Sequence, residues 1–249
     1  MSMVLFVSLG HAKTEAMNTL DLSAINQLEF PSDQYFKEVT EKTQVCLHHT
    51  ASGRGVSGDY GHWLKNKSRI ATCVIVDSTG VINQLFSSKY WGWHLGIPHR
   101  TFSKNHLPYK NLNKSTIGLE IDAWGGLKYI DNEWRAYPND YGRGKLTNRK
   151  GDTIKVVVDT SEVVLYPNKY RGYKGFQKYT DAQIESTRQL LVYWGEVYNI
   201  PLDYDEDMWD VNIKALKGSP GITTHNSYRK DKSDCHPQKE LVEMLKSLA

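Results

Sequence analysis

The sequence predicts an α/β fold, in which a β-sheet is flanked by helices. Short β-prone runs separated by turn residues, such as Ala71–Val76, indicate strands, and the segment that follows Thr180 has the cap and spacing of an amphipathic helix. A chain of 249 residues can form one large domain with a sizeable core. We therefore expect a single domain over residues 1–249.

Composition narrows the class of protein. The chain is 39% hydrophobic and 24% charged, which is ordinary for a globular domain, and no apolar run approaches the ~20 residues needed to span a bilayer. A net charge of +3 is too mild to indicate a nucleic-acid partner. The three cysteines, Cys46, Cys73 and Cys235, argue against a disulfide framework because their number is odd and low. We expect a monomer that neither crosses a membrane nor binds nucleic acid.

Residues 1–43 read as an N-terminal arm. Its apolar stretch, Met3–Leu9, is short and has no basic residue before it, so it makes a poor signal peptide. A buried first strand is the alternative interpretation. The expected place of synthesis is therefore the cytoplasm.

The first predicted strand covers residues 44–50. With a period of two, Cys46, His48 and Thr50 share one face, whereas His49 lies on the other. Only one of the two neighbouring histidines can therefore face a given site. A hairpin follows, with strands at 71–76 and 81–86.

Two later segments carry polar groups of interest. Tyr90–Gly96 combines three aromatic residues with a histidine between glycines, which suits either a binding lip or a core cluster. The predicted strand Thr116–Asp122 places Gly118, Glu120 and Asp122 on one face. A carboxylate inside an apolar strand is unfavourable unless it has a partner or a function.

Residues 127–178 differ from their surroundings in charge. They contain 11 Lys/Arg and 6 Asp/Glu, a balance of +5, and six of the 15 tyrosines. Residues 154–158 and 163–166 read as two strands of a hairpin. We interpret the segment as an insertion that forms a basic, tyrosine-rich surface, and a solvated loop without a role is the alternative.

The C-terminal third is predicted to contain two helices and a short strand. Thr180 and Gln183 form a capping box for a helix that ends before Pro201, and Pro237 opens the last helix. Between them, Gly221–His225 reads as a strand that delivers His225 at its end.

The polar loop after this strand contains His225 and Cys235, ten residues apart. Imidazole and thiolate together suit zinc, and the best third donor lies in the His48–His49 pair. Two histidines, one cysteine and one open position would form a catalytic rather than a structural zinc site. A His/Cys pair is also often incidental, and its spacing is not that of a common zinc finger.

Four separated motifs resemble one family. They are Leu47–Thr50 (Leu-His-His-Thr), Trp93–Gly96 (Trp-His-Leu-Gly), Ile117–Glu120 (Ile-Gly-Leu-Glu), and His225 together with Cys235–Pro237. In this order they resemble the zinc-dependent N-acetylmuramoyl-L-alanine amidases of the type-2 group, which includes phage endolysins and peptidoglycan recognition proteins. The resemblance spans about residues 44–248 but does not cover the 127–178 insertion.

The resemblance implies a central mixed β-sheet flanked by helices, as in peptidoglycan recognition proteins, and hydrolysis of the amide between N-acetylmuramic acid and L-alanine in bacterial peptidoglycan. It implies a Zn²⁺ ion and these roles: ligands His48, His225 and Cys235; general base Glu120; oxyanion stabilisation by His94 or Ser233; substrate contacts from Trp93 and Thr50. Some members have Tyr where Thr72 stands, so here the base role falls to Glu120. Members of the family carry Lys, Thr or Ser two residues before the third ligand, and here Ser233 stands at that position.

The resemblance leaves more than one biological setting open. A phage-type endolysin, released to the host cell wall through a holin-type pore, is the favoured expectation because the basic insertion suits a large polymer. A cytosolic amidase that trims recycled muropeptides is the alternative. A non-catalytic peptidoglycan-binding protein of the same fold would be expected to lack the zinc ligands.

Overall fold

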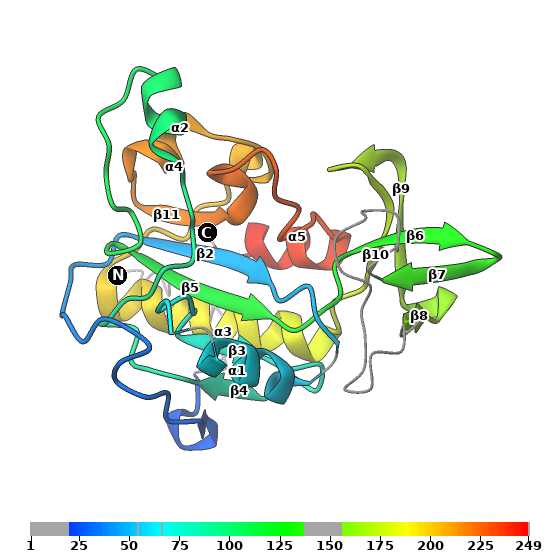
Figure 1. The fold of residues 1–249 in the computed structure, drawn as a ribbon, viewed down its shortest axis with the longest axis horizontal. Helices are drawn as coiled ribbons and strands as arrows, with labels where there is room; N and C mark the ends of the chain where they lie inside the picture. Colours follow the sequence, from blue (N-terminus) through cyan, green and yellow to red (C-terminus); the bar gives the residue numbers. More distant parts are fainter. Residues whose placement is uncertain (1–19, 54, 66, 137–155, 249) are drawn as a thin grey trace, which may run out of the picture.

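The structure is a computed structural model that describes residues 20–53, 55–65, 67–136 and 156–248. Its centre is a six-stranded sheet (Figure 1). In spatial order the strands are β1 (Asn26–Gln27), β4 (Ile82–Gln84), β3 (Val74–Val76), β5 (Thr116–Ile121), β2 (Gln44–His49) and β11 (Gly221–Thr224). Only β3 and β4 run antiparallel, so the sheet is mixed, and the predicted fold class is confirmed.

The two central strands are buried on both faces. Every residue of β2 and β5 is buried, which agrees with their position between parallel neighbours. Their register places Cys46 opposite Gly118 and His48 opposite Glu120. The polar side chains of both strands therefore lie on the same face of the sheet, side by side.

Helices cover the sheet unequally. Helices α3 (Asp181–Tyr198) and α5 (Lys239–Lys246) pack on the face that carries Val45 and Leu47, where they form the main core. The opposite face carries a smaller apolar cluster beside α2 (His99–Lys104) and α4 (Ile213–Lys217). None of the described helices is long and apolar enough to cross a membrane.

Helix α3 begins as its sequence predicts. The Thr180 hydroxyl accepts a hydrogen bond from the Gln183 amide, and the Gln183 side chain accepts one from the Thr180 amide. The helix ends at Tyr198, and Asn199 follows in the left-handed conformation, just before Pro201.

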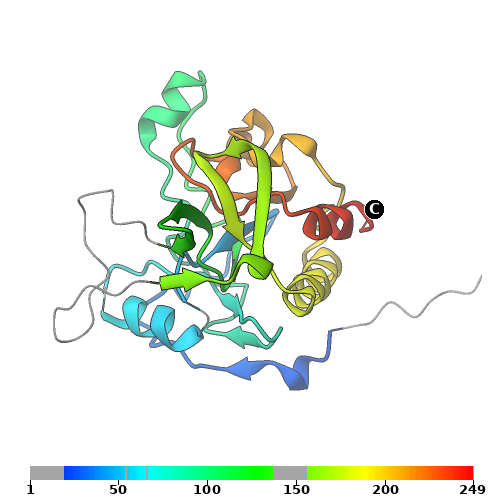
Figure 2. The same cartoon turned by 90° about the vertical axis from the view of Figure 1, so that its right-hand side faces the viewer.

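The 127–178 insertion forms most of a second, antiparallel sheet beside the carboxyl ends of β2 and β5 (Figures 1 and 2). Its strands, in spatial order, are β8 (Val156–Val158), β7 (Glu133–Ala136), β6 (Gly126–Ile130), β10 (Tyr173–Gln177) and β9 (Val163–Tyr170). The strands at 156–158 and 163–170 lie at opposite edges, so the predicted hairpin between them is wrong. The 3-10 turn Thr160–Glu162, which Asp159 caps, separates them.

Strand β9 pairs instead with β10. Arg171 and Gly172 connect the two strands, and both have positive φ, at 48° and 90°. Two such residues suit a tight hairpin whose twist matches that of its strands.

The remaining α-helix of the described residues is α1 (Val56–Lys65), which follows β2. The apolar stretch Met3–Leu9 and five of the basic residues of the insertion lie outside the described residues.

Candidate functional site

A cavity of about 230 Å³ opens where the carboxyl ends of the parallel strands meet. His48 lies near the end of β2, Glu120 near the end of β5, and His225 directly after β11. The wall also includes Trp63, Trp93, Lys232 and Asp234. Parallel packing of three strands thus brings together groups that lie up to 186 residues apart in the sequence.

The hydrogen bonds of His225 determine which of its ring nitrogens carries the proton. Nε2 lies 2.8 Å from the Leu95 carbonyl oxygen, which can only accept, so Nε2 is protonated. The other ring nitrogen, Nδ1, faces His48 and Asp234 in the cavity.

His48 is oriented in the same way through His94. The His94 Nε2 lies 3.2 Å from the Thr116 carbonyl oxygen and donates to it, which leaves His94 Nδ1 as an acceptor. His48 Nε2 lies 3.0 Å from that Nδ1 and donates to it. The His48 Nδ1 lone pair then also faces the cavity. Burial and the neighbouring His225 lower the pKa of His48 to about 4, which favours its neutral form.

The third donor that the structure offers is a carboxylate. Asp234 Oδ2 lies 3.0 Å from His48 Nδ1 and 2.8 Å from His225 Nδ1, and the two nitrogens are 3.1 Å apart. Although burial opposes ionisation of Asp234, the two imidazoles hold its pKa well below the ordinary value. The two imidazole nitrogens and the carboxylate oxygen therefore converge on one point in the cavity.

This donor set fits zinc. Tetrahedral coordination at the usual bond lengths separates ligand atoms by about 3.3 Å, close to the spacing found here. Imidazole nitrogen and carboxylate oxygen are both zinc ligands, and three protein ligands leave a position for substrate or water. The second ring nitrogen of each histidine is already hydrogen-bonded, as is usual for metal ligands.

Cys235 is not brought to the two imidazoles. Its side chain is fully buried in the main core, and its thiol donates to the His48 carbonyl oxygen at 3.3 Å. Burial raises the pKa of this thiol well above its ordinary value, which disfavours the thiolate that would bind a metal. Cys235, the expected third ligand, thus lies away from the two imidazoles, and its neighbour Asp234 lies beside them. Adjacent residues in an extended loop point in different directions.

A second group of potential ligands lies beside the first. Cys46, His48 and His94 also come close together. Here, however, His48 Nε2 and His94 Nδ1 are hydrogen-bonded to each other, and burial raises the pKa of the Cys46 thiol well above its ordinary value. The Cys46 thiol is thus a poor ligand in this group, whereas the group around Asp234 offers a carboxylate.

Glu120 projects into the same cavity. It is 9% exposed, and its Oε2 is buried with no hydrogen-bond partner among the described residues. Burial, reinforced by the negative charges of Asp234 and Asp59, raises the pKa of Glu120 well above its ordinary value. A carboxyl group in this state can carry a proton at neutral pH and transfer it.

The other expected site residues are distributed unequally. Trp93, Thr50 and His94 line the cavity, but both His94 ring nitrogens are occupied by His48 and by a carbonyl oxygen. Ser233 is partly buried and is not among the lining residues, whereas the adjacent Lys232 is. Sequence reasoning missed Asp234 and Lys232. The signal was available, because Lys232 stands two residues before Asp234, the spacing that the type-2 amidases show.

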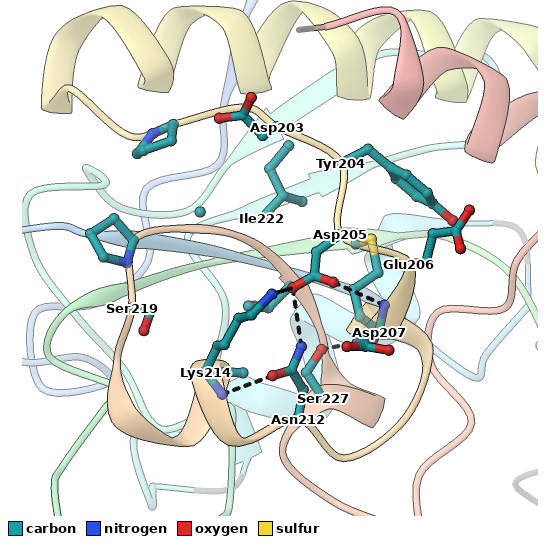
Figure 3. Close-up of a pocket in the computed structure, with 16 residues that line it drawn as sticks. Asp203, Tyr204, Asp205, Glu206, Asp207, Asn212, Lys214, Ser219, Ile222 and Ser227 are labelled. Atoms are coloured by element: carbon teal, nitrogen blue, oxygen red, sulfur yellow. Dashed lines mark hydrogen bonds and ion pairs between the residues drawn. The ribbon is translucent and has the colours of Figure 1, made fainter.

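A larger cavity of about 550 Å³ lies elsewhere, between the end of α3 and α4 (Figure 3). It is acidic, but its central carboxylate, Asp205, already accepts hydrogen bonds from Lys214, Asn212 and the Asp207 amide. The bond from the Asp207 amide caps the 3-10 turn Glu206–Trp209. The central carboxylate of this cavity thus has hydrogen-bond partners, whereas Glu120 Oε2 of the smaller cavity has none among the described residues.

The family model described as N-acetylmuramoyl-L-alanine amidase (Amidase_2) matches residues 39–237. The chain belongs to this family. No curated protein sequence matches it. The match extends over all the residues that line the cavity and includes the 127–178 insertion.

Several solved structures are similar. "Structure of PlyL" has a TM-score of 0.49 at 12% identity and covers 90% of this chain and 98% of its own. N-acetylmuramoyl-L-alanine amidase LysC from Clostridium intestinale URNW has a TM-score of 0.45 at 11% identity, covering 90% and 95%. The selenomethionine AmpD derivative has a TM-score of 0.45 at 12% identity, covering 91% and 95%.

Proposed function

We propose that this protein is a zinc-dependent N-acetylmuramoyl-L-alanine amidase that cuts the bond between N-acetylmuramic acid and L-alanine in bacterial peptidoglycan. The observation that carries the proposal is the convergence of His48 Nδ1, His225 Nδ1 and Asp234 Oδ2 within 3.1 Å of one another. Bound zinc supplies a Lewis acid, which polarises the scissile carbonyl and makes water a better nucleophile at neutral pH.

Glu120 performs the proton transfers in this proposal. Its partnerless Oε2 accepts a proton from the attacking water and returns it to the leaving nitrogen of L-alanine. Its raised pKa suits the second transfer, because a carboxyl group that holds a proton near neutral pH is an effective acid.

Lys232 is the preferred group for the developing oxyanion. It lines the cavity, and its ammonium group offers positive charge where the tetrahedral intermediate forms. His94, for which this role was expected, has no free N–H, and we assign it the orientation of His48 instead. Trp93 offers a ring face to a sugar or lactyl group, and Thr50 offers a hydroxyl group.

The substrate is proposed to be the wall polymer, attacked in the manner of a phage-type endolysin released through a holin-type pore. A muropeptide-recycling amidase remains the alternative. A non-catalytic wall-binding protein is disfavoured because it has no use for a buried, partnerless carboxyl group such as Glu120 beside three converging donors.

The test is an assay on purified cell wall that counts new L-alanine amino groups and new reducing ends. We expect amino groups only, their loss after chelation, and recovery with one zinc ion per chain. New reducing ends, or full activity in protein shown to be free of metal, would overturn the proposal. Comparing intact sacculi with soluble muropeptides then separates the endolysin from the recycling enzyme.

A further inference from the structure

Two of the three proposed ligands lie on one irregular segment, residues 225–236, which we call the ligand loop. Only its first three residues form a regular turn, and it then runs without helix or strand to Asp234. A carboxylate on such a segment samples many positions unless other parts of the chain fix it. The ligand loop therefore needs anchors outside itself.

The strongest anchor is a hydrogen-bond network around the Asn226 side chain. The Asn226 Nδ2 donates to the Cys235 carbonyl oxygen at 2.6 Å and to the Tyr170 hydroxyl at 2.9 Å. The Tyr170 hydroxyl in turn donates to the Trp209 carbonyl oxygen at 3.0 Å. Asn226 follows the second ligand and Cys235 follows the third. One fully buried amide therefore connects the two ligand-bearing backbone segments to the insertion.

A second anchor holds His236, two residues after Asp234. The buried His236 ring donates from Nε2 to the Gln177 carbonyl oxygen at 3.1 Å, so its Nδ1 accepts from the Tyr166 hydroxyl at 2.8 Å. The same ring stacks on Phe176 at 4.6 Å between centroids. Tyr166, Phe176 and Gln177 all belong to β9 and β10.

A third anchor lies at the tip of the β9–β10 hairpin. Arg171 Nη1 donates to the Lys230 carbonyl oxygen at 3.0 Å, and Nη2 forms an ion pair with Asp210 at 2.8 Å. Only 11% of the Arg171 side chain is exposed, so this guanidinium is held rather than solvated. In Figure 2, which looks onto the hairpin, the orange-red segment before α5 passes beside it.

We propose that the β9–β10 hairpin is a clamp that fixes the ligand loop, with Tyr166, Tyr170 and Arg171 as positioning residues for the zinc ligand Asp234. The inference rests on the proposed zinc site. Tyr166 and Tyr170 do not belong to the tyrosine-rich surface expected of the insertion, since both are partly buried and their hydroxyls bond inward.

The clamp acts on the metal site through the backbone. Zinc tolerates only small deviations in ligand distance, and outer partners that orient ligands typically change metal affinity by about 10–100-fold. The Tyr170 and Tyr166 hydroxyls reach the residues directly after Asp234. Their loss would leave the loop attached at both ends but free to move the carboxylate.

The experiment compares identical substitutions inside and outside the clamp. Tyr170→Phe and Arg171→Gln remove clamp bonds, whereas Tyr129→Phe and Arg135→Gln alter another part of the same sheet. Tyr129 is 57% exposed, and Arg135 pairs within its own hairpin with Asp131 and Glu133. For each full-length variant, three quantities are measured: zinc affinity by competition with a chromophoric chelator, amide hydrogen exchange, and thermal unfolding without metal.

We expect Tyr170→Phe and Arg171→Gln to weaken zinc binding by about 10-fold and to speed exchange at amides 230–236 in metal-free protein. The two control variants should match the wild type in both measurements. A purely structural role would lower the melting temperature without changing zinc affinity of the folded protein. Two clamp variants are used so that the test can still be made if one of them does not fold.

Unchanged zinc affinity and unchanged exchange in both clamp variants would overturn the clamp. Failure of the proposed function looks different, because the wild type itself would then bind no zinc. Hydrogen exchange in the metal-free protein tests the clamp even in that case.

Discussion

The two neighbouring histidines of strand β2 lie on opposite faces and differ in their hydrogen-bond surroundings. On one side, His48 Nδ1 lies 3.1 Å from His225 Nδ1 and 3.0 Å from Asp234 Oδ2. On the other side, His49 accepts from the Tyr179 hydroxyl at 2.9 Å, and that hydroxyl also accepts from the His236 amide at 3.3 Å. Both rings are almost completely buried, so burial alone does not distinguish them.

The difference lies in whether the polar groups satisfy one another. Around His49, Tyr179 and His236, hydrogen bonds pair donors with acceptors, which is the ordinary condition of buried polar groups. Around His48, two imidazole nitrogens and one carboxylate oxygen crowd together, and Glu120 has an oxygen with no hydrogen-bond partner among the described residues. Such an arrangement is stable only if a cation or protons occupy it. Buried polar groups without hydrogen-bond partners thus indicate the functional face, and buried polar groups with partners indicate the scaffold.

The largest expected difference is between His48→Ala and His49→Ala. His48→Ala removes a proposed ligand, so we expect loss of tightly bound zinc and of wall-lytic activity. His49→Ala should retain zinc but lower stability by about 1–3 kcal/mol, because it leaves the Tyr179 hydroxyl without its acceptor. Zinc content and lysis of purified wall, measured side by side, check the pair. Loss of zinc from His49→Ala alone would reverse our assignment of the two faces.

The contrast between Asp234 and Cys235 is the next test. Asp234→Ala removes a ligand and should weaken zinc binding by at least about 10²-fold. Cys235→Ala should keep zinc at one ion per chain and cost about 1–2 kcal/mol through lost packing and a lost bond to the His48 carbonyl oxygen. Elemental analysis and chemical unfolding measure the two effects. If Cys235→Ala is the variant that loses zinc, the carboxylate is not the third ligand.

These two residues show where sequence reasoning reached its limit. The strict two-residue period of a strand is enough to separate His48 from His49, and the strands, α3 and its cap could be predicted from the same local rules. The ligand loop has no period. The family spacing fits both Lys232 with Asp234 and Ser233 with Cys235, so it does not decide between them. Which of the two faces the imidazoles depends on long-range contacts such as the bond from the Cys235 thiol to the His48 carbonyl oxygen.

The insertion shows the same limit in another form. Its composition indicated a basic, tyrosine-rich segment, but composition does not tell which way side chains point. Tyr166 and Tyr170 are four residues apart on β9, and this even spacing was a usable signal that they share a face. That the shared face packs against His236 could not be predicted, because the contact spans 70 residues.

Glu120→Gln should have a smaller effect than loss of a ligand, and it separates chemistry from metal binding. The substitution keeps the shape of the side chain and leaves the three donors intact. We expect zinc content to be unchanged and kcat to fall by about 10²-fold or more, the scale of a lost general base. Turnover on wall fragments and zinc content are measured on the same sample. A near-normal kcat would move the proton transfers to another group.

The smallest expected effect concerns Asp59, which lies at the edge of the His48 face. Its carboxylate is 8% exposed and accepts a hydrogen bond from Ser52 at 2.8 Å. Burial raises the pKa of Asp59 to about 6, although Ser52 opposes the shift. The folded protein therefore binds this proton more tightly than the unfolded chain does. The group favours folding at low pH, and this contribution is lost as the pH rises through about 6.

Asp59→Asn keeps an oxygen that can accept from Ser52 but removes the charge. A shift of about 2 pKa units corresponds to at most ~3 kcal/mol, which solvent near the cavity mouth reduces to about 1 kcal/mol. We therefore expect the metal-free variant to be more stable than the wild type by about 1 kcal/mol at pH 7.5, with little difference near pH 4. Urea unfolding at the two pH values measures this.

The same substitution also reaches the catalytic carboxyl group. Because the negative charge of Asp59 contributes to the raised pKa of Glu120, its removal should move the acidic limb of the kcat profile to lower pH. Equal stability changes at both pH values would show that the Asp59 carboxylate is not under electrostatic strain. The His48 face would then differ from the His49 face only at the three donors and Glu120.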